Sequence, residues 1–150
     1  MRIVLQRVKR ASVEVSGTCI SKIGAGYLVL FGVTQADTLE DAEWLARKVA
    51  TLRLMEDNTG AMASSVAEAG GEILVVSQFT LFASCKKGTR PSWQRAAGRD
   101  IAIPLYEAFC QKLAEASGRP VKTGEFGANM QVELLNDGPV TLLLDSKARE

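Results

Sequence analysis

Histidine is absent from the 150 residues of this sequence. Without an imidazole, a Ser-His-Asp or Cys-His catalytic site, a His-ligated catalytic zinc and an imidazole proton shuttle are all excluded. An enzyme with this composition would use carboxylate, lysine or tyrosine side chains for its acid–base chemistry, or groups that belong to the substrate.

Cysteine is scarce as well, and Cys19, Cys85 and Cys110 are widely spaced with no C-x-x-C pair among them. An odd number of isolated thiols argues against a disulfide framework and against a zinc ribbon. We therefore expect reduced thiols in a cytoplasmic protein.

Other familiar signals are missing too. The longest apolar runs, such as "YLVLF" and "ILVV", fall far short of the roughly 20 residues of a membrane span. The opening "MRIVLQRVKR" mixes charges with apolar residues, unlike a secretory signal. There is no P-loop, no G-x-G-x-x-G between strand and helix and no metal-ligand cluster, so we expect no cofactor and no metal.

Charge is unevenly distributed, although the formal net charge is only +1. Residues 1–10 and 86–99 contain Lys and Arg but no acid, whereas the acids gather around residues 37–43 and 56–72. A basic face on a neutral protein suits a polyanion such as nucleic acid. Scattered solvated lysines and arginines would produce the same composition.

The periodicity predicts an α+β fold in a single domain over residues 1–150. Strands alternate through residues 2–33, a nearly continuous apolar run over 70–82 indicates a strand buried on both faces, and two strands are expected on either side of residues 136–139. One amphipathic helix should begin at Asp37 or Thr38 and end near Leu52.

The second helix should run from about Ile103 to Ser117, with Pro104 in its first turn and Gly118 at its C-cap. Mainly antiparallel sheets with two helices on one side follow from this order of elements. Residues 146–150, "SKARE", should form a loose polar tail.

Three short stretches could carry function, each with a simpler structural alternative. "NDGPVT" at 136–141 is either a hairpin turn or a backbone held in a special shape for something to contact. "SQFTL" at 77–81 is either a polar strand end or an oxyanion hole, in which Thr80 has no visible base to make it a nucleophile. In "GTRPSW" at 88–93, Arg90 and Trp93 suit phosphate contact and base stacking, or else a surface ion pair and a core position.

Together with the opening "RIVLQRVKRASVEV" and "TGEFGANMQVELLNDGPVT" at 123–141, these stretches resemble D-aminoacyl-tRNA deacylase, the D-tyrosyl-tRNA deacylase family. The similarity extends from Met1 to about Leu144 and leaves both defining motifs intact. It implies a layered β-β-α sandwich, a homodimer with active sites at the subunit interface, and hydrolysis of the ester of D-aminoacyl-tRNA or glycyl-tRNA without a cofactor.

The resemblance also implies roles for particular residues. Catalysis would involve Ser77, Gln78, Phe79 and Thr80. Gly138 and Pro139 match the family's Gly-cis-Pro pair, which with Met130 would serve substrate binding and chiral selection in the partner's pocket. There, rigid backbone beside the substrate Cα would leave room only for hydrogen and so reject L-aminoacyl-tRNA. From their position after the site-bearing strand, Lys86, Lys87 and Arg90 are predicted to contact tRNA phosphates.

Two other functions are compatible with the same residues. A non-catalytic RNA-binding module would keep the fold and the basic face but lack turnover. A purely structural oligomeric β-protein would leave the basic stretch 86–99 without a role.

Overall fold

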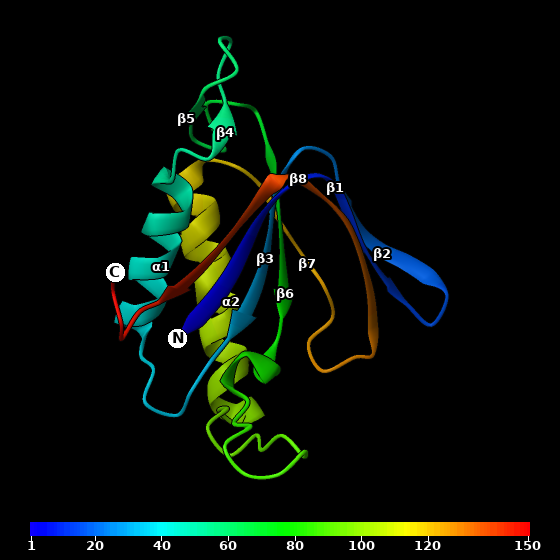
Figure 1. The fold of residues 1–150 in the computed structure, drawn as a ribbon, viewed down its shortest axis with the longest axis vertical. Coiled ribbons are helices and arrows are strands. Elements are labelled where there is room, and N and C mark those ends of the chain that lie inside the picture. The colour runs from blue at the N-terminus through cyan, green and yellow to red at the C-terminus, as the bar shows by residue number, and fades with distance from the viewer.

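The chain, described here by a computed structural model of residues 1–150, forms a six-stranded sheet with both helices on one side (Figure 1). The sheet contains β1 (Arg2–Val15), β2 (Thr18–Ile23), β3 (Gly26–Gly32), β6 (Glu72–Ser77), β7 (Val121–Thr123) and β8 (Met130–Asp145). The helices are α1 (Leu39–Thr51) and α2 (Arg99–Ser117). A small separate hairpin pairs β4 (Met55–Glu56) with β5 (Met62–Ser64).

The long strand β1 organises the sheet. It pairs antiparallel with β3 through its first half, with β2 through its second half and with β8 along its whole length. Strands β3, β6 and β7 then follow one another in parallel. The predicted α+β fold, with mainly antiparallel pairing and two helices on one side, is confirmed.

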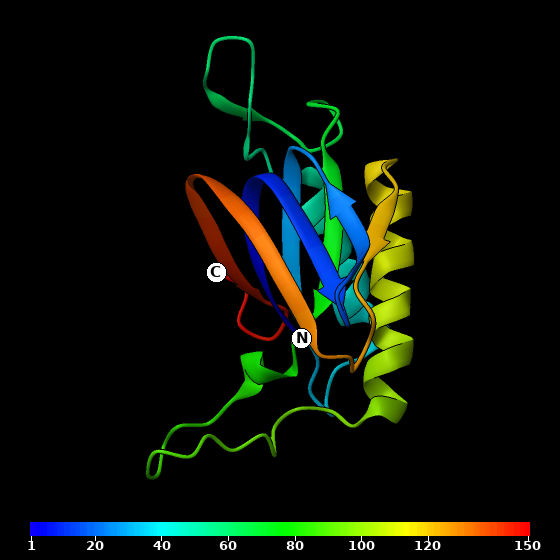
Figure 2. The same cartoon turned by 90° about the vertical axis from the view of Figure 1, so that its right-hand side faces the viewer.

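Strands β1 and β8 bend together, so that the sheet folds over itself (Figure 2). The bend coincides with two shifts of register. At the first, residues 137–140 of β8 lie opposite the single residue Arg7 of β1, and at the second, Lys9 of β1 has no opposite residue. Of the two alternatives for "NDGP", the hairpin turn is therefore wrong. The chain does not turn back to pair with itself, because both halves of β8 remain paired with β1 across the bulge.

Folding the sheet over creates two cores and three layers. One core lies between the sheet and the helices, and the other lies between the two halves of the folded sheet. On β3, Tyr27 and Phe31 face the first core and Leu28 faces the second, which explains why this strand reads as a continuous apolar run. The layered β-β-α arrangement is confirmed.

The bulge also changes which side of β1 each core uses. Ile3 and Leu5 pack into the helix-side core, whereas Val8, Ala11 and Val13 pack inside the folded sheet. Because alternate residues of a strand face opposite sides, an irregularity at the corner allows one strand to serve both cores.

The helices follow the predicted signals, with one difference. Thr38 caps α1 in a capping box with Asp41, and Gly118 ends α2 with a φ of 63°. Helix α2 begins at Arg99 rather than near Ile103, so Pro104 lies inside the helix and not, as predicted, in its first turn. The added turn brings Ala102 into the core. Neither helix combines the length and the apolar character that crossing a membrane requires.

The predicted loose tail is instead docked on α1. Ser146 is buried, the Lys147 ammonium lies 2.8 Å from the Asp41 carboxylate, and the Arg149 guanidinium lies 4.5 Å from the centre of the Trp44 ring. Composition alone indicated a solvated tail, because the acid and the aromatic ring that hold it belong to a distant part of the sequence.

Candidate active site

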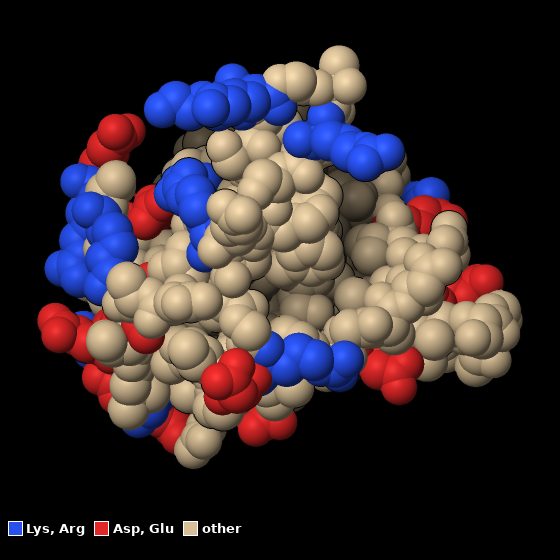
Figure 3. Space-filling model, turned by 90° about the horizontal axis from the view of Figure 1, so that it is seen from below, with Lys and Arg blue, Asp and Glu red and all other residues tan.

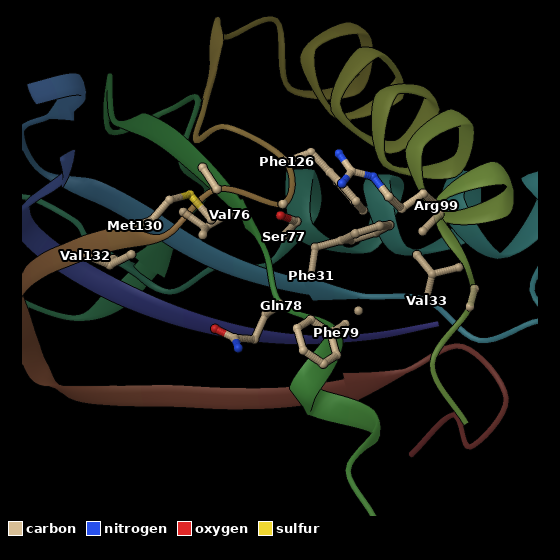
Figure 4. A pocket seen from close by; sticks show the side chains of 15 residues that line it. Phe31, Val33, Val76, Ser77, Gln78, Phe79, Arg99, Phe126, Met130 and Val132 are labelled. Atoms are coloured by element: carbon tan, nitrogen blue, oxygen red, sulfur yellow. The ribbon is translucent and has the colours of Figure 1, made fainter. Parts of the chain in front are cut away.

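A pocket of about 360 Å³ opens where β6 ends (Figure 4). Its walls come from the ends of β3 and β6, the start of α2, the loop between β7 and β8, and the first part of β8. The side chains labelled in Figure 4 are Phe31, Val33, Val76, Ser77, Gln78, Phe79, Arg99, Phe126, Met130 and Val132.

The local sequence explains why the chain leaves the sheet here. Strand β6 ends at Ser77, and the Gln78 amide donates a last hydrogen bond of 2.7 Å to the Phe31 carbonyl of β3. The chain then forms a 3₁₀-helix over Phe79–Phe82. A Cβ at Gly32 would lie 2.9 Å from the Gln78 carbonyl, so a glycine at this position lets the turn approach β3.

Of the predicted catalytic residues, the structure places Ser77, Gln78 and Phe79 in the pocket wall, together with the predicted Met130. Thr80 does not line the pocket, and its hydroxyl accepts a hydrogen bond from the Gln78 side-chain amide. Gly138 and Pro139 do not line this pocket of their own chain either.

Two backbone amides at this turn lack an acceptor within the 3₁₀-helix. The first amide to bond inside it is that of Leu81, at 3.2 Å from the Gln78 carbonyl. Phe79 and Thr80 are the first residues of the helix, and such positions have N–H groups without intrahelical partners. They are therefore suitable donors for an oxyanion next to Ser77 and Gln78.

Acid–base groups are few around the pocket, since Arg99 is the only lining residue with an ionisable side chain. Behind the wall, the Tyr106 hydroxyl donates to the Val75 carbonyl at 2.7 Å, and burial raises the pKa of Tyr106 above its ordinary value. Burial likewise raises the pKa of the Cys110 thiol to about 12. Both groups stay protonated at neutral pH, and neither serves as a base.

Sequence patterns did not single out two pocket residues, Arg99 and Phe126. The Arg99 guanidinium lies 5.8 Å from the Phe126 ring centre (Figure 4). A Cβ at Gly127 would lie only 3.1 Å from a guanidinium nitrogen of Arg99. Gly127 also has a φ of 78°, which favours glycine. The only signal for Phe126 was "TGEFGANM" as part of the family resemblance, because a loop has no periodicity to interpret, and Arg99 appeared only as the last cation of the basic stretch 86–99.

The bulge in β8 is held by two polar side chains. The buried Arg7 guanidinium donates to the Asp137 carbonyl at 2.9 Å and to the Leu54 carbonyl at 2.8 Å. The Asn136 side chain accepts from the Val140 amide at 2.9 Å and donates to the Val140 carbonyl at 3.2 Å. Between these anchors, the Gly138–Pro139 peptide bond is cis and both residues are exposed.

Residues 83–98 form an arm that leaves the site, and Lys86, Lys87 and Arg90 are exposed on it. Mutual backbone hydrogen bonds of 2.9 and 2.8 Å between Ser84 and Ser92 close the arm at its base. Figure 3 views this end of the molecule, where blue Lys and Arg side chains border the tan surface.

The structural alternatives for "GTRPSW", a core position for Trp93 and a surface ion pair for Arg90, are both wrong. Trp93 is 42% exposed and so does not belong to either core. Arg90 is absent from all the ion pairs of the chain, and so are Lys86 and Lys87.

Comparison with known proteins decides the family. A family model described as D-Tyr-tRNA(Tyr) deacylase matches residues 4–145. The chain belongs to this family. The prediction drawn from the four motifs is thereby confirmed, and with it the enzyme class, a hydrolase that acts on aminoacyl-tRNA.

Curated relatives have a matching name, and solved structures share the fold. A D-aminoacyl-tRNA deacylase of Parabacteroides distasonis is 58% identical over 150 residues, which cover 100% of both chains. The structure of a c-Myc DNA unwinding element binding protein superposes with a TM-score of 0.91 at 43% identity, covering 99% of this chain and 100% of the other. A probable eukaryotic D-amino acid tRNA deacylase shares the fold, with a TM-score of 0.81 at 18% identity and coverage of 95% and 97%.

Replacing Arg7 by Met should destabilise the corner of the sheet. The Asp137 and Leu54 carbonyls would lose their charged donor, so we expect the free energy of unfolding to fall by about 2–4 kcal/mol in urea titrations followed by circular dichroism. Arg10→Met is the matched control, because Arg10 is exposed on the same strand and its ion pair with Glu133, at 3.7 Å, should contribute less than about 1 kcal/mol. Equal losses in the two variants would contradict the anchoring role of Arg7.

Proposed function

We propose that this chain removes D-amino acids from tRNA and so proofreads chirality during translation. It would hydrolyse the ester between a D-amino acid, or glycine, and the terminal adenosine of tRNA, and would leave L-aminoacyl-tRNA intact. The family membership supports deacylation itself. The stereochemical selection, the acceptance of glycine and the dimeric site are proposed from the arrangement of the residues, and a cytoplasmic location is proposed from the three isolated thiols.

The observation that carries the proposal is a pocket with polar groups but no side-chain base, so that nothing in its wall would activate the Ser77 hydroxyl as a nucleophile. An aminoacyl ester is more reactive than an amide, and the ribose 2′-hydroxyl beside it can assist the attacking water. The water oxygen would bond to the carbonyl carbon, and the amides of Phe79 and Thr80 would stabilise the resulting oxyanion. The ester C–O bond then breaks, and the proton passes to the leaving ribose oxygen.

Side-chain recognition is not required for chiral selection in this proposal. If the exposed bulge at Gly138 and Pro139 lies against the substrate Cα, only hydrogen fits on that side. A D-amino acid presents hydrogen there, an L-amino acid presents its side chain, and glycine has no side chain to clash. The hydrogen bonds of Arg7 and Asn136 support such a role, because the backbone of a steric filter must keep its position when a side chain presses against it.

A second copy of the chain would have to deliver this bulge, since Gly138 and Pro139 do not line their own pocket. Strand β8 pairs only with β1, which leaves its other edge without a partner strand. Leu135 and Leu143 on the same strand are 42% and 63% exposed. An unpaired edge with exposed leucines on both sides of the bulge favours a homodimer through β8.

A second candidate is binding of nucleic acid without turnover. The name of the 43% identical solved protein, which describes binding to a DNA element, favours keeping this alternative. Release of free D-amino acid by the purified protein from D-aminoacyl-tRNA, but not from the matched L-aminoacyl-tRNA, would distinguish the enzyme from a binding module.

Replacing Gly138 by Ala should weaken the chiral filter. Gly138 has a φ of 146°, and its Cβ would lie 2.7 Å from the Val140 amide nitrogen, so the bulge would have to shift. Strain of this kind costs roughly 1–3 kcal/mol, and we expect the D-over-L ratio of kcat/KM to fall on the order of ten-fold. Matched D- and L-tyrosyl-tRNA would serve as substrates.

Gly60→Ala is the control for this variant, because Gly60 also has a positive φ but its Cβ would meet no atom within 4 Å. It should leave the D-over-L ratio unchanged. A Gly138→Ala protein with the original ratio and normal stability would remove the bulge from the selection mechanism.

Thr80→Ala should retain activity, because the hydroxyl contacts the Gln78 amide rather than a base. We expect kcat/KM for D-aminoacyl-tRNA to fall by less than about 10²-fold, which is the lower end of the loss caused by removing a general acid or base. D-Aminoacyl-tRNA ending in 2′-deoxyadenosine should react much more slowly with the unaltered protein. Trapping of an acyl-Thr80 intermediate, or equal rates for the two tRNAs, would contradict this mechanism.

Neutralising the arm should weaken tRNA binding at low salt. Replacing Lys86, Lys87 and Arg90 together by Gln removes three exposed cations that have no carboxylate partner. Each lost phosphate contact should reduce the slope of log Kobs against log salt by about 0.7–0.9. Lys112→Gln, on the far helix surface and paired with Glu43, is the control. Unchanged tRNA binding would show that these three side chains contact solvent and not the tRNA phosphates.

A further inference from the structure

We propose that Phe79 and Trp93 form a stacking platform for the nucleotide that precedes the terminal adenosine of tRNA. This inference rests on the proposed function, because it assumes that the pocket holds the aminoacylated terminal nucleoside. It assigns a second binding site, at the mouth of that pocket, to a base of the single-stranded end of tRNA.

The two rings form an exposed pair at the mouth of the pocket. Their centroids are 5.3 Å apart and their planes meet at 77°, an edge-to-face arrangement. Phe79 lines the pocket from the 3₁₀-helix, whereas Trp93 lies outside it at the base of the arm. The pair thus connects the pocket to the arm (Figure 4 shows Phe79 at the lower edge of the pocket).

Packing does not explain these side chains. Phe79 is 55% exposed and Trp93 is 42% exposed, and neither belongs to a core cluster. The 3₁₀-helix already has an anchor in Phe82, which is buried and packs beneath the Arg2 guanidinium at 4.8 Å. Large aromatic rings that remain exposed next to a site are better explained by a ligand than by stability.

A nucleotide is the ligand that the surroundings favour. An edge-to-face pair leaves a ring face open for a flat base, and such stacking is independent of sequence. Beyond Trp93, the arm presents Lys86, Lys87 and Arg90 and no carboxylate over residues 86–99. A strand leaving the pocket would therefore meet an aromatic platform first and cations for its phosphates next.

The position along tRNA follows from the order of these features. With the terminal adenosine in the pocket, the next residue toward the 5′ side is the first base outside it. Phe79 belongs to the pocket wall and Trp93 is its direct neighbour, so the platform begins one nucleotide from the ester. All tRNAs end in the same CCA sequence, so a platform for this cytidine would serve every tRNA alike.

Truncated substrates separate this role from that of the pocket. D-Tyrosyl-adenosine lacks the preceding cytidine, whereas D-tyrosyl-CpA contains it. We expect Trp93→Ala to lower kcat/KM for D-tyrosyl-CpA roughly ten-fold, as the loss of one base stack would, and to leave D-tyrosyl-adenosine unchanged. Trp93→Phe should restore most of the loss, because it keeps an aromatic face.

Equal losses on the two substrates would overturn the proposal, since Trp93 would then act on the pocket or on the fold. No loss on either substrate would overturn it as well.

A binding measurement tests the platform independently of turnover. The chain has two tryptophans, so Trp44→Phe leaves Trp93 as the only one. We expect CpA to quench the fluorescence of Trp93 and adenosine alone to leave it unchanged. Quenching by CpA in a protein that hydrolyses no ester would refute the proposed function but support the platform. Identical responses to CpA and adenosine would refute the platform even in an active enzyme.

Discussion

One buried guanidinium joins the parts of this molecule on which its architecture depends. Arg7 is 5% exposed, and its hydrogen bonds to the Asp137 and Leu54 carbonyls connect β1 to the bulge of β8 and to the segment that follows α1. Buried carbonyls at an irregular corner would otherwise lack donors, because the sheet ladder is interrupted there. The same contact therefore permits the sheet to fold over and fixes the shape of the exposed peptide at residues 138–139.

The regular elements of the fold could be predicted from sequence because their signals are local. Thr38 with Asp41 marks the start of α1, Gly118 marks the end of α2, and the apolar runs of β3 and β6 indicate strands covered on both faces. Residues 136–139 carry equally strong local signals for a hairpin turn, and there the hairpin alternative failed. What overrides them is pairing with β1 and the side chain of Arg7, both of which are more than a hundred residues away in sequence.

The residues of the candidate site can likewise be separated into those with a local sequence signal and those without one. Ser77, Gln78 and Phe79 were accessible to sequence reasoning because polar residues ending an apolar strand are unusual, and the structure places all three in the pocket wall. Arg99 and Phe126 were not, since each lies in or beside a loop and is brought to the pocket by tertiary packing. The proposed filter at Gly138 and Pro139 depends further on a second copy of the chain, which no pattern within one sequence can place.

The chemistry and the selection would then rest on different parts of the protein. A pocket without a base of its own would leave proton transfer to water and to the substrate's ribose, so side-chain substitutions inside it would act mainly on positioning. Selection against L-amino acids would rest on backbone atoms, which substitutions cannot remove but can displace. In this proposal stereochemistry would therefore be governed by the residues that hold the corner of the sheet, Arg7 and Asn136, neither of which lines the pocket of its own chain. In such a design the accuracy of proofreading is a property of local rigidity, and it would decline before the rate of hydrolysis as the corner is weakened.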